Sequence, residues 1–150
     1  MKADDPKIDM LKTIPRLKDR PAKELAELAR LVDVCQFPEG TVLAVEGKFG
    51  SETLVVVDGE VEVVVADRVV ARVGPGEFIG EMAQIDHGRR SATVRATVPV
   101  TALVIGPQAF PTVIDNPTVA KAMLQGVVTR MRRAQAVVAE DAALDMRAEA

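Results

Sequence analysis

The chain has 150 residues, of which 48% are hydrophobic, and a formal net charge of −3. This length fits one domain with a sizeable core. The small acidic surplus argues against a protein whose main activity is nucleic-acid binding, since such proteins usually carry a basic surplus or a basic face. The single cysteine, Cys35, excludes an intramolecular disulfide and fits a reducing compartment. We expect its thiol to be buried.

The first residues carry no targeting signal. Residues 1–9 are polar and lack the apolar core of a secretory signal. The sequence also lacks a run of about 20 apolar residues, the length that a membrane-spanning helix needs. A cytoplasmic protein without a membrane span is therefore expected.

The N-terminal part is predicted to be helical. Residues 1–6 are expected to form a tail and residues 7–35 to form helices. Apolar residues three positions apart between Ile8 and Leu17 predict one or two helical turns. The segment 21–32 has an apolar face and a charged face and begins with proline, which predicts an amphipathic helix.

Residues 36–106 have the pattern of an all-β unit. Valine-rich segments separated by turn residues predict short strands, and these cover residues 41–45, 53–57, 60–63, 69–73, 91–98 and 100–105. Asp58-Gly59 is predicted to form a two-residue hairpin loop, and Asp67-Arg68 another turn. Short strands at this spacing indicate a sandwich or a barrel.

Helices are expected again over residues 107–147. A short helix is predicted over residues 108–113, and Asn116-Pro117 is typical of a helix start. The following helix should reach about Met146, a length of about 45 Å at about 1.5 Å per residue. Its far end should therefore pack on something other than the β unit, or fray. Its apolar stripe from Val119 to Met131 can pack on the β unit or form a dimer contact.

The stretch 78–94 holds the residues with the most informative chemistry. Arg90 can donate two parallel hydrogen bonds to a phosphate. Backbone N–H groups after Gly80 can point at the same anion, and Glu81 can accept a hydrogen bond from a sugar hydroxyl. On spacing alone, an ordinary ion pair between Glu81 and Arg90 at a loop is an equally good interpretation.

A family resemblance adds to this interpretation. Phe78-Ile79-Gly80-Glu81-Met82-Ala83, followed by Arg90-Ser91-Ala92-Thr93-Val94, resembles the phosphate-binding cassette of the cyclic nucleotide-binding domain. That family includes the catabolite activator protein, the regulatory subunits of protein kinase A and cyclic nucleotide-gated channels. The resemblance covers about residues 11–135. It implies a single domain over 1–150, with an eight-stranded antiparallel jelly-roll barrel, N-terminal helices and a long C-terminal lid helix.

The resemblance also implies roles for individual residues. Arg90 resembles the arginine that pairs with the cyclic phosphate, and Glu81 the carboxylate that binds the ribose 2′-hydroxyl. The implied ligand-binding set is Gly80, Glu81, Met82, Ala83, Arg90, Ser91 and Ala92, with Val70 on the strand beside the base.

Some positions depart from the family pattern. Arg89 stands where a proline is common, and its guanidinium either strengthens the attraction of an anion or, as we expect, faces water. Val137 and Val138 are apolar where the long helix would reach the base. Ser91 in place of threonine favours cAMP over cGMP.

An enzyme is not expected. His87 is the only histidine, whereas a metal-dependent jelly-roll enzyme needs several histidine ligands. The glycines do not have the spacing of a dinucleotide-binding loop. We therefore predict no catalytic residue, no metal site and no cofactor, with cAMP or cGMP as a ligand only.

The predicted function is a regulatory sensor domain that repacks its C-terminal helix when a cyclic nucleotide binds. One alternative is a fragment of a catabolite-activator-type transcription regulator. Too few residues follow Val138 for a helix-turn-helix module, so we expect this chain not to contact nucleic acid. Another alternative is a jelly-roll interaction module that binds no nucleotide. The C-terminal helix is a candidate contact for a homodimer or an effector protein. Its cluster Arg130, Arg132 and Arg133 is expected to be a solvated face or a contact for an acidic partner.

Overall fold

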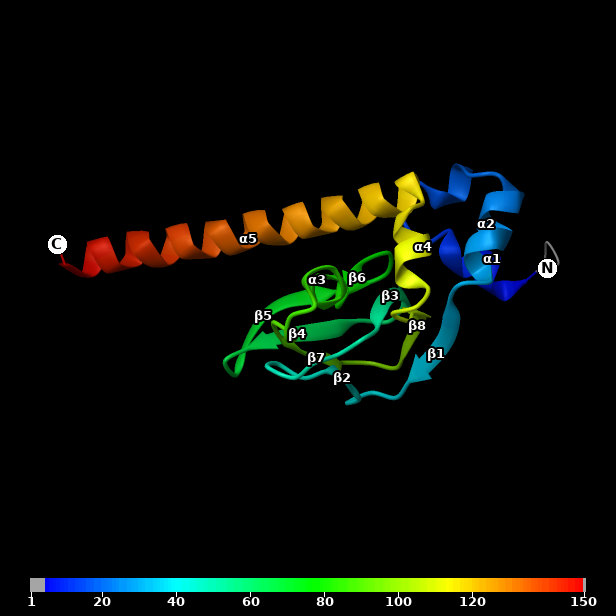
Figure 1. Ribbon diagram of the computed structural model, residues 1–150. Coiled ribbons are helices and arrows are strands. Elements are labelled where there is room, and N and C mark those ends of the chain that lie inside the picture. Colours follow the sequence, from blue (N-terminus) through cyan, green and yellow to red (C-terminus); the bar gives the residue numbers. More distant parts are fainter. Residues whose placement is uncertain (1–4, 150) are drawn as a thin grey trace.

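The computed structural model describes residues 5–149. Figure 1 shows the strands lying together below one long helix, α5 (Pro117–Glu149). The shorter helices α1 (Pro6–Leu11), α2 (Ala22–Ala29) and α4 (Phe110–Ile114) gather at the end of the molecule where α5 begins. A short 3₁₀ turn, η1, covers Leu17–Asp19.

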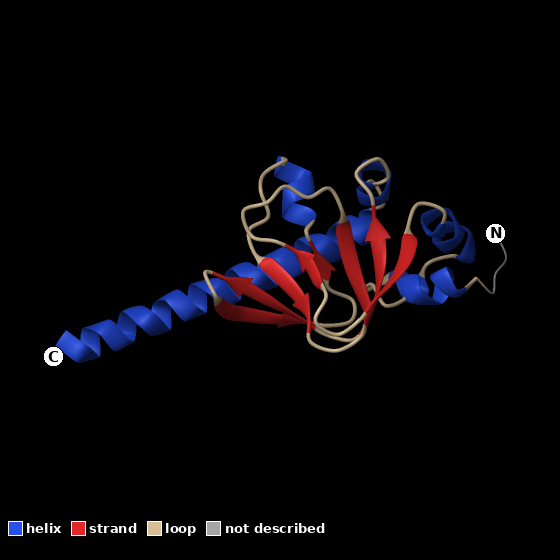
Figure 2. Cartoon of the chain, turned by 90° about the horizontal axis from the view of Figure 1, so that it is seen from below, coloured by secondary structure: helices blue, strands red, loops and turns tan. Residues whose placement is uncertain are grey.

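The eight strands form two four-stranded antiparallel sheets. The first sheet has the order β1 (Asp33–Phe37), β8 (Val100–Ile105), β3 (Thr53–Asp58) and β6 (Phe78–Ile79). The second sheet has the order β2 (Val42–Ala44), β7 (Thr93–Ala96), β4 (Val61–Val65) and β5 (Arg68–Val73). Seen from below, the strands fall into two groups with the long helix behind them (Figure 2).

This arrangement corrects one part of the predicted fold. A mainly β unit with flanking helices and a long C-terminal helix is present, and the strands number eight. Within the described residues, however, no strand pairing joins the two sheets into the closed barrel that we expected. The unit is a jelly-roll-like sandwich of two open sheets.

The first sheet has a core on each of its faces. Leu54 and Val56 of β3 pack with residues of the second sheet, whereas Val55 between them packs with the helices. The reason is the two-residue alternation of side chains along a strand. The helical layer includes the buried side chains of Leu25 and Val119. The start of α5 is therefore fixed to the sandwich by apolar burial.

The predicted hairpin at Asp58-Gly59 is wrong. Strands β3 and β4 belong to different sheets, so this turn carries the chain from one sheet to the other. Gly59 has a φ of +98°, which explains the glycine without requiring a hairpin. The tight hairpin is instead at Ala66 and Asp67, which join β4 to β5 and have φ values of +49° and +64°.

Two other local expectations also need correction. Strand β1 begins at Asp33, although we expected helix up to residue 35. Cys35 lies on this strand, and its side chain is partly buried rather than fully buried.

Helix α5 has 33 residues, a length of about 50 Å at about 1.5 Å per residue. Its first turns are anchored by Val119, Ala122 and Met123, which are buried. Every residue from 131 to 148 is exposed. The helix continues to Glu149, and its exposed far end packs on no other described part of the chain. We expected this end either to pack on something other than the β unit or to fray.

None of the described helices combines the length and the apolar character needed to cross a membrane.

The start of α5 depends on Asn116. Its Oδ1 accepts hydrogen bonds from the backbone N–H groups of Thr118 and Val119, at 3.0 and 3.1 Å. Its Nδ2 donates to Oε1 of Glu24 on α2 at 2.8 Å. This hydrogen bond and the guanidinium of Arg20 lower the pKa of Glu24 below its ordinary value. One side chain thus caps α5 and ties it to α2.

We predict that Asn116→Ala lowers the free energy of unfolding by about 1–2 kcal/mol, because both the cap and the bond to Glu24 are lost. Urea denaturation measures this. Asn116→Ser keeps a capping oxygen and should retain most of the stability. The pKa of Glu24 is lower in the folded chain than its ordinary value of 4.5. The stabilisation that its charged carboxylate provides is therefore fully present above pH 4.5 and is lost as the pH falls through the folded pKa. The difference in the free energy of unfolding between wild type and Asn116→Ala should therefore become smaller in acid. A difference that does not change with pH would contradict this prediction.

Candidate functional site

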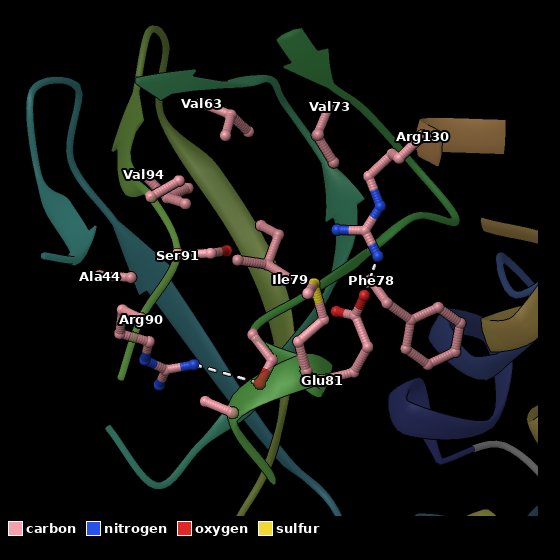
Figure 3. A pocket seen from close by; sticks show the side chains of 14 residues that line it. Ala44, Val63, Val73, Phe78, Ile79, Glu81, Arg90, Ser91, Val94 and Arg130 are labelled. Atoms are coloured by element: carbon pink, nitrogen blue, oxygen red, sulfur yellow. Dashed lines mark hydrogen bonds and ion pairs between the residues drawn. The ribbon is translucent and has the colours of Figure 1, made fainter. Parts of the chain in front are cut away.

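A small pocket lies between the second sheet, the segment 78–92 and helix α5 (Figure 3). Its cavity volume is about 60 Å³. The charged and polar residues that line it are Glu81, Arg90, Ser91 and Arg130. Its apolar lining comes from Ala44, Val63, Val73, Ile79 and Val94, with Phe78 at one end.

Arg90 is held beneath the pocket by backbone carbonyl groups. The residue is only 8% exposed. Its Nη1 donates to the carbonyl oxygen of Gly80 at 3.2 Å, and its Nη2 donates to that of Glu52 at 2.8 Å. Burial lowers the pKa of Arg90, whereas the nearby carboxylate of Glu52 opposes this shift. The guanidinium is thus a fixed positive charge that still has N–H groups left to donate.

Two glycines make room for this guanidinium. A Cβ placed on Gly50 would lie 2.1 Å from Nε of Arg90, and one on Gly80 would lie 2.2 Å from its Nη1. Gly80 also has a φ of +84° at the start of α3 (Glu81–Asp86), a conformation that favours glycine. The position of the charge therefore depends on the absence of two side chains.

The loop before β3 also holds the backbone of Arg90. The amide of Arg90 donates to the carbonyl of Lys48 at 2.7 Å, and its carbonyl accepts from the amide of Gly47 at 2.9 Å. The neighbouring Arg89 is exposed, as we predicted, but its guanidinium also contacts other residues. Its Nη1 donates to the carbonyl of Gly47 at 2.9 Å, and its guanidinium lies 4.5 Å from the ring centroid of Phe49.

Glu81 is the most unusual residue of the site, because its carboxylate is completely buried. Within the described part of the chain, neither of its oxygens accepts a hydrogen bond. A buried carboxylate is costly unless a charge or hydrogen bonds compensate it. Its compensation is an ion pair with Arg130, which reaches down from α5 (Figure 3).

Arg130 is itself largely withdrawn from water, with 33% of its side chain exposed. Burial lowers its pKa, and the carboxylate of Glu77 opposes this shift from a greater distance. The guanidinium stays protonated because arginine does not lose its proton in proteins. The guanidinium of Arg130 therefore contacts the carboxylate of Glu81, which we predict to bind a sugar hydroxyl.

Seven of the eight predicted ligand-binding residues lie around this one pocket: Gly80, Glu81, Met82, Ala83, Arg90, Ser91 and Ala92. The alternative ion pair between Glu81 and Arg90 does not form, because each has other partners. Val70 does not line the pocket among the described residues and is 57% exposed on β5. The side chain of Val73 on the same strand lines the pocket instead. Whether these residues bind a ligand stays a prediction here.

Sequence reasoning missed two parts of the site. Arg130 lines the pocket, which contradicts the expectation of a solvated face. Its neighbours Arg132 and Arg133 are exposed, as expected. Gly50 is not among the predicted site residues. Glycine at 50 is a weak signal in the sequence, and no spacing rule links Arg130 to Glu81.

We predict that Arg130→Met lowers the free energy of unfolding by about 2 kcal/mol, because it leaves the carboxylate of Glu81 buried without a partner charge. This is less than the about 3–5 kcal/mol of a fully buried pair, because Arg130 is partly exposed. The double variant with Glu81→Gln should regain most of the loss. Urea denaturation of both single variants and the double variant measures the coupling, and simple additivity would contradict the ion pair.

The family described as "Cyclic nucleotide-binding domain" matches residues 34–116. The Pycsar effector protein PaPycTIR of Pseudomonas aeruginosa is 33% identical over 114 residues, which cover 75% of this chain and 36% of that protein. The chain thus spans about a third of the length of this relative.

Two solved structures have a similar fold. A cyclic nucleotide-binding domain from Methylobacillus flagellatus has a TM-score of 0.76 and 26% identity, and the match covers 89% of this chain and 82% of that one. The cAMP-bound PfPKA-R has a TM-score of 0.74 and 19% identity, and the match covers 87% of this chain and 45% of that one. The second likeness concerns the fold alone.

The family match includes the strands and helix α3 that place Glu81 and Arg90 beside one pocket, and it covers more than half of the sequence. This chain belongs to the cyclic nucleotide-binding domain family.

Proposed function

We propose that this chain is a sensor domain that binds a cyclic nucleotide, cAMP in preference to cGMP, and that binding changes the position of helix α5. One observation carries the proposal. The two charged residues that the family pattern assigns to the phosphate and the ribose, Arg90 and Glu81, face one pocket, and α5 supplies the present partner of Glu81.

The phosphate would bind on the Arg90 side. Two N–H groups of the guanidinium are engaged by the carbonyls of Gly80 and Glu52, so the side chain is oriented before a ligand arrives. An arginine has five N–H groups in all, which leaves donors for a phosphate oxygen. The hydroxyl of Ser91 points into the same side of the pocket (Figure 3). Preorganisation of this kind reduces the entropy that binding costs.

The ribose would bind at Glu81. Oε1 of Glu81 faces the guanidinium of Arg130, and Oε2 has no hydrogen-bond partner within the described chain, so Oε2 has capacity for a ligand hydroxyl. A hydroxyl cannot neutralise the charge as Arg130 does, but it supplies a hydrogen bond to a charged acceptor, which typically contributes about 1.5–3 kcal/mol. Glu81 is thus able to exchange one partner for the other.

The base would lie against the apolar wall of Val63, Val73 and Val94. Guanine has two exocyclic polar groups, whereas adenine has one. Each polar group left without a partner against an apolar wall costs about 1–3 kcal/mol. We therefore expect cAMP to bind at least about fivefold more tightly than cGMP, in the same direction as the preference inferred from Ser91.

The size of the cavity connects binding to α5. A volume of about 60 Å³ is far below the about 300–1,000 Å³ of ligand pockets. A nucleotide can enter only if a lining group moves, and Arg130 is the lining group on the element with an uncovered end. Binding therefore favours states in which Arg130 has left Glu81. The equilibrium between the two positions of α5 shifts only by the ratio of the ligand's affinities for them.

We predict saturable binding of cAMP in a calorimetric titration of the whole chain. Arg90→Ala should weaken the affinity at least about 30-fold, because two charge-assisted hydrogen bonds to the phosphate are lost. Gly50→Ala should weaken it at least about tenfold while the arginine is still present, because the new Cβ displaces the guanidinium.

Gly106→Ala is the matched control, since a Cβ there meets no atom within 4 Å and should leave the affinity unchanged. If neither cAMP nor cGMP gives heat or a thermal shift at millimolar concentration, the proposal fails and the chain is an interaction module without a nucleotide. Binding that Arg90→Ala leaves unchanged would place the ligand elsewhere.

A further inference from the structure

The sandwich is open along one edge. Strand β1 is an edge of the first sheet and β2 is an edge of the second, and no pairing between described strands joins them. The core between the sheets is less complete here, since Phe37, Leu43 and Ala44 are only partly buried against it. The chain has four phenylalanines and neither tryptophan nor tyrosine, so few bulky side chains are available to fill this edge.

A cavity of about 490 Å³ occupies the open edge. We call it the edge cavity, and its inner walls include Cys35 and Phe37 of β1, Leu43 of β2, Leu54 of β3 and Val104 of β8. Leu54 and Val104 are buried core residues, so the edge cavity reaches the interior of the sandwich. Its volume lies within the about 300–1,000 Å³ that is typical of ligand pockets.

The rim of the edge cavity is apolar although it faces water. Val42, Val45 and Phe49 line it, and they are 49%, 45% and 69% exposed. Single apolar side chains on a surface need no explanation, but a group of them around a concave surface is typical of a binding site. The rim therefore indicates that the edge cavity binds apolar atoms of a ligand.

Two cations meet at the edge cavity. Lys48 is exposed and forms no ion pair among the described residues. The guanidinium of Arg90 lies deeper, and in the described chain its Nη1 and Nη2 donate hydrogen bonds whereas its Nε does not. This Nε is the nitrogen nearest to Gly50, which also lines the cavity. One carboxylate, that of the exposed Glu52, lies there as well, so positive charge is in excess.

We propose that the edge cavity binds a small amphipathic anion, a carboxylate on an unbranched apolar chain. The chain would take the place of the missing core between the two sheets, whose walls are apolar. The carboxylate would lie between the ammonium of Lys48 and the Nε–H of Arg90, because a carboxylate accepts charge-assisted hydrogen bonds from both.

The edge cavity shares Arg90 and Ala44 with the pocket of Glu81, but its other lining residues are different. Gly80, beside Nη1 of Arg90, lines the pocket, whereas Gly50, beside Nε, lines the edge cavity. The proposal does not rest on nucleotide binding. A chain that failed to bind cAMP would still be expected to bind the anion, so the failures of the two proposals are distinguishable.

Cys35 reports whether the edge cavity is occupied. It is the single cysteine of the chain, it lines the cavity, and its side chain is partly buried. We expect octanoate, kept below its micelle concentration, to slow the reaction of this thiol with N-ethylmaleimide in a saturable manner, at least about fivefold, because the reaction depends on access to the thiol. Unfolding by the amphiphile would expose the thiol and speed the reaction, so slowing reports binding.

The same chain with the opposite charge tests the head group. Octylammonium should need at least about a tenfold higher concentration than octanoate for half-maximal protection, because it loses the charge-assisted hydrogen bonds and meets two cations. Lys48→Glu should weaken octanoate about threefold, the modest effect of an exposed charge, and should favour octylammonium. Equal protection of wild type by the two amphiphiles would overturn the proposal.

Two valines provide matched variants. Val45→Glu places a carboxylate at the rim and should weaken octanoate at least about tenfold, because it removes an apolar contact and repels the head group. Val98→Glu should leave the affinity unchanged, since Val98 is similarly exposed, at 40%, and is not among the described residues that line the edge cavity. Both side chains are exposed, so the fold is retained in each variant.

Chain length gives the last measurement. From butanoate to octanoate, each methylene that the edge cavity buries should tighten binding by up to about fourfold. Octanoate that leaves the thiol reaction unchanged at its highest monomeric concentration would overturn the proposal. Protection that does not depend on chain length, or equal effects of the two valine variants, would overturn it as well.

Discussion

The buried carboxylate of Glu81 and the guanidinium that compensates it are the interaction on which the site depends. Glu81 is held by a short helix whose first turn is possible because Gly80 adopts a left-handed conformation. A charge in this position has to be compensated, and Arg130 meets that requirement from α5. One ion pair therefore connects the floor of the pocket to a helix that is otherwise uncovered at its far end.

The second charge of the site is treated in a different way. Arg90 is satisfied by backbone carbonyls of Gly80 and Glu52, in a space that Gly50 leaves open. Glu52 directly precedes β3 and Gly80 directly follows β6, so both carbonyls are placed by strands of the sandwich and not by α5. The pocket thus combines a cation held by backbone carbonyls with an anion whose partner comes from α5. This asymmetry gives a physical reason why the response to a ligand would pass through Glu81 to α5, and not through Arg90.

The sequence predicted the local features well because local rules determine them. The valine-rich strands and the asparagine and proline at the start of α5 follow from short-range patterns. The grouping of Glu81 with Arg90 around one ligand rests on the family resemblance, because spacing alone favours an ordinary ion pair equally. Features set by tertiary contacts were missed. Asp58-Gly59 has the composition of a hairpin, but strand pairing elsewhere makes it a link between sheets. Arg130 meets Glu81 only because the whole helix crosses the pocket. The error at Val70 could have been avoided from the sequence. The alternation of side chains along β5 places Val73 on the inner face and Val70 on the outer face.

The central claim is that a cyclic nucleotide takes the place of Arg130 on Glu81. The most direct measurement follows the side-chain Nε–H signal of Arg130 by NMR, with that of Arg90 as an internal reference. The account predicts that saturating cAMP moves the Arg130 signal toward that of a solvent-exposed arginine with faster hydrogen exchange, while the Arg90 signal stays protected. An Arg130 signal that is unchanged when cAMP is bound would contradict the account.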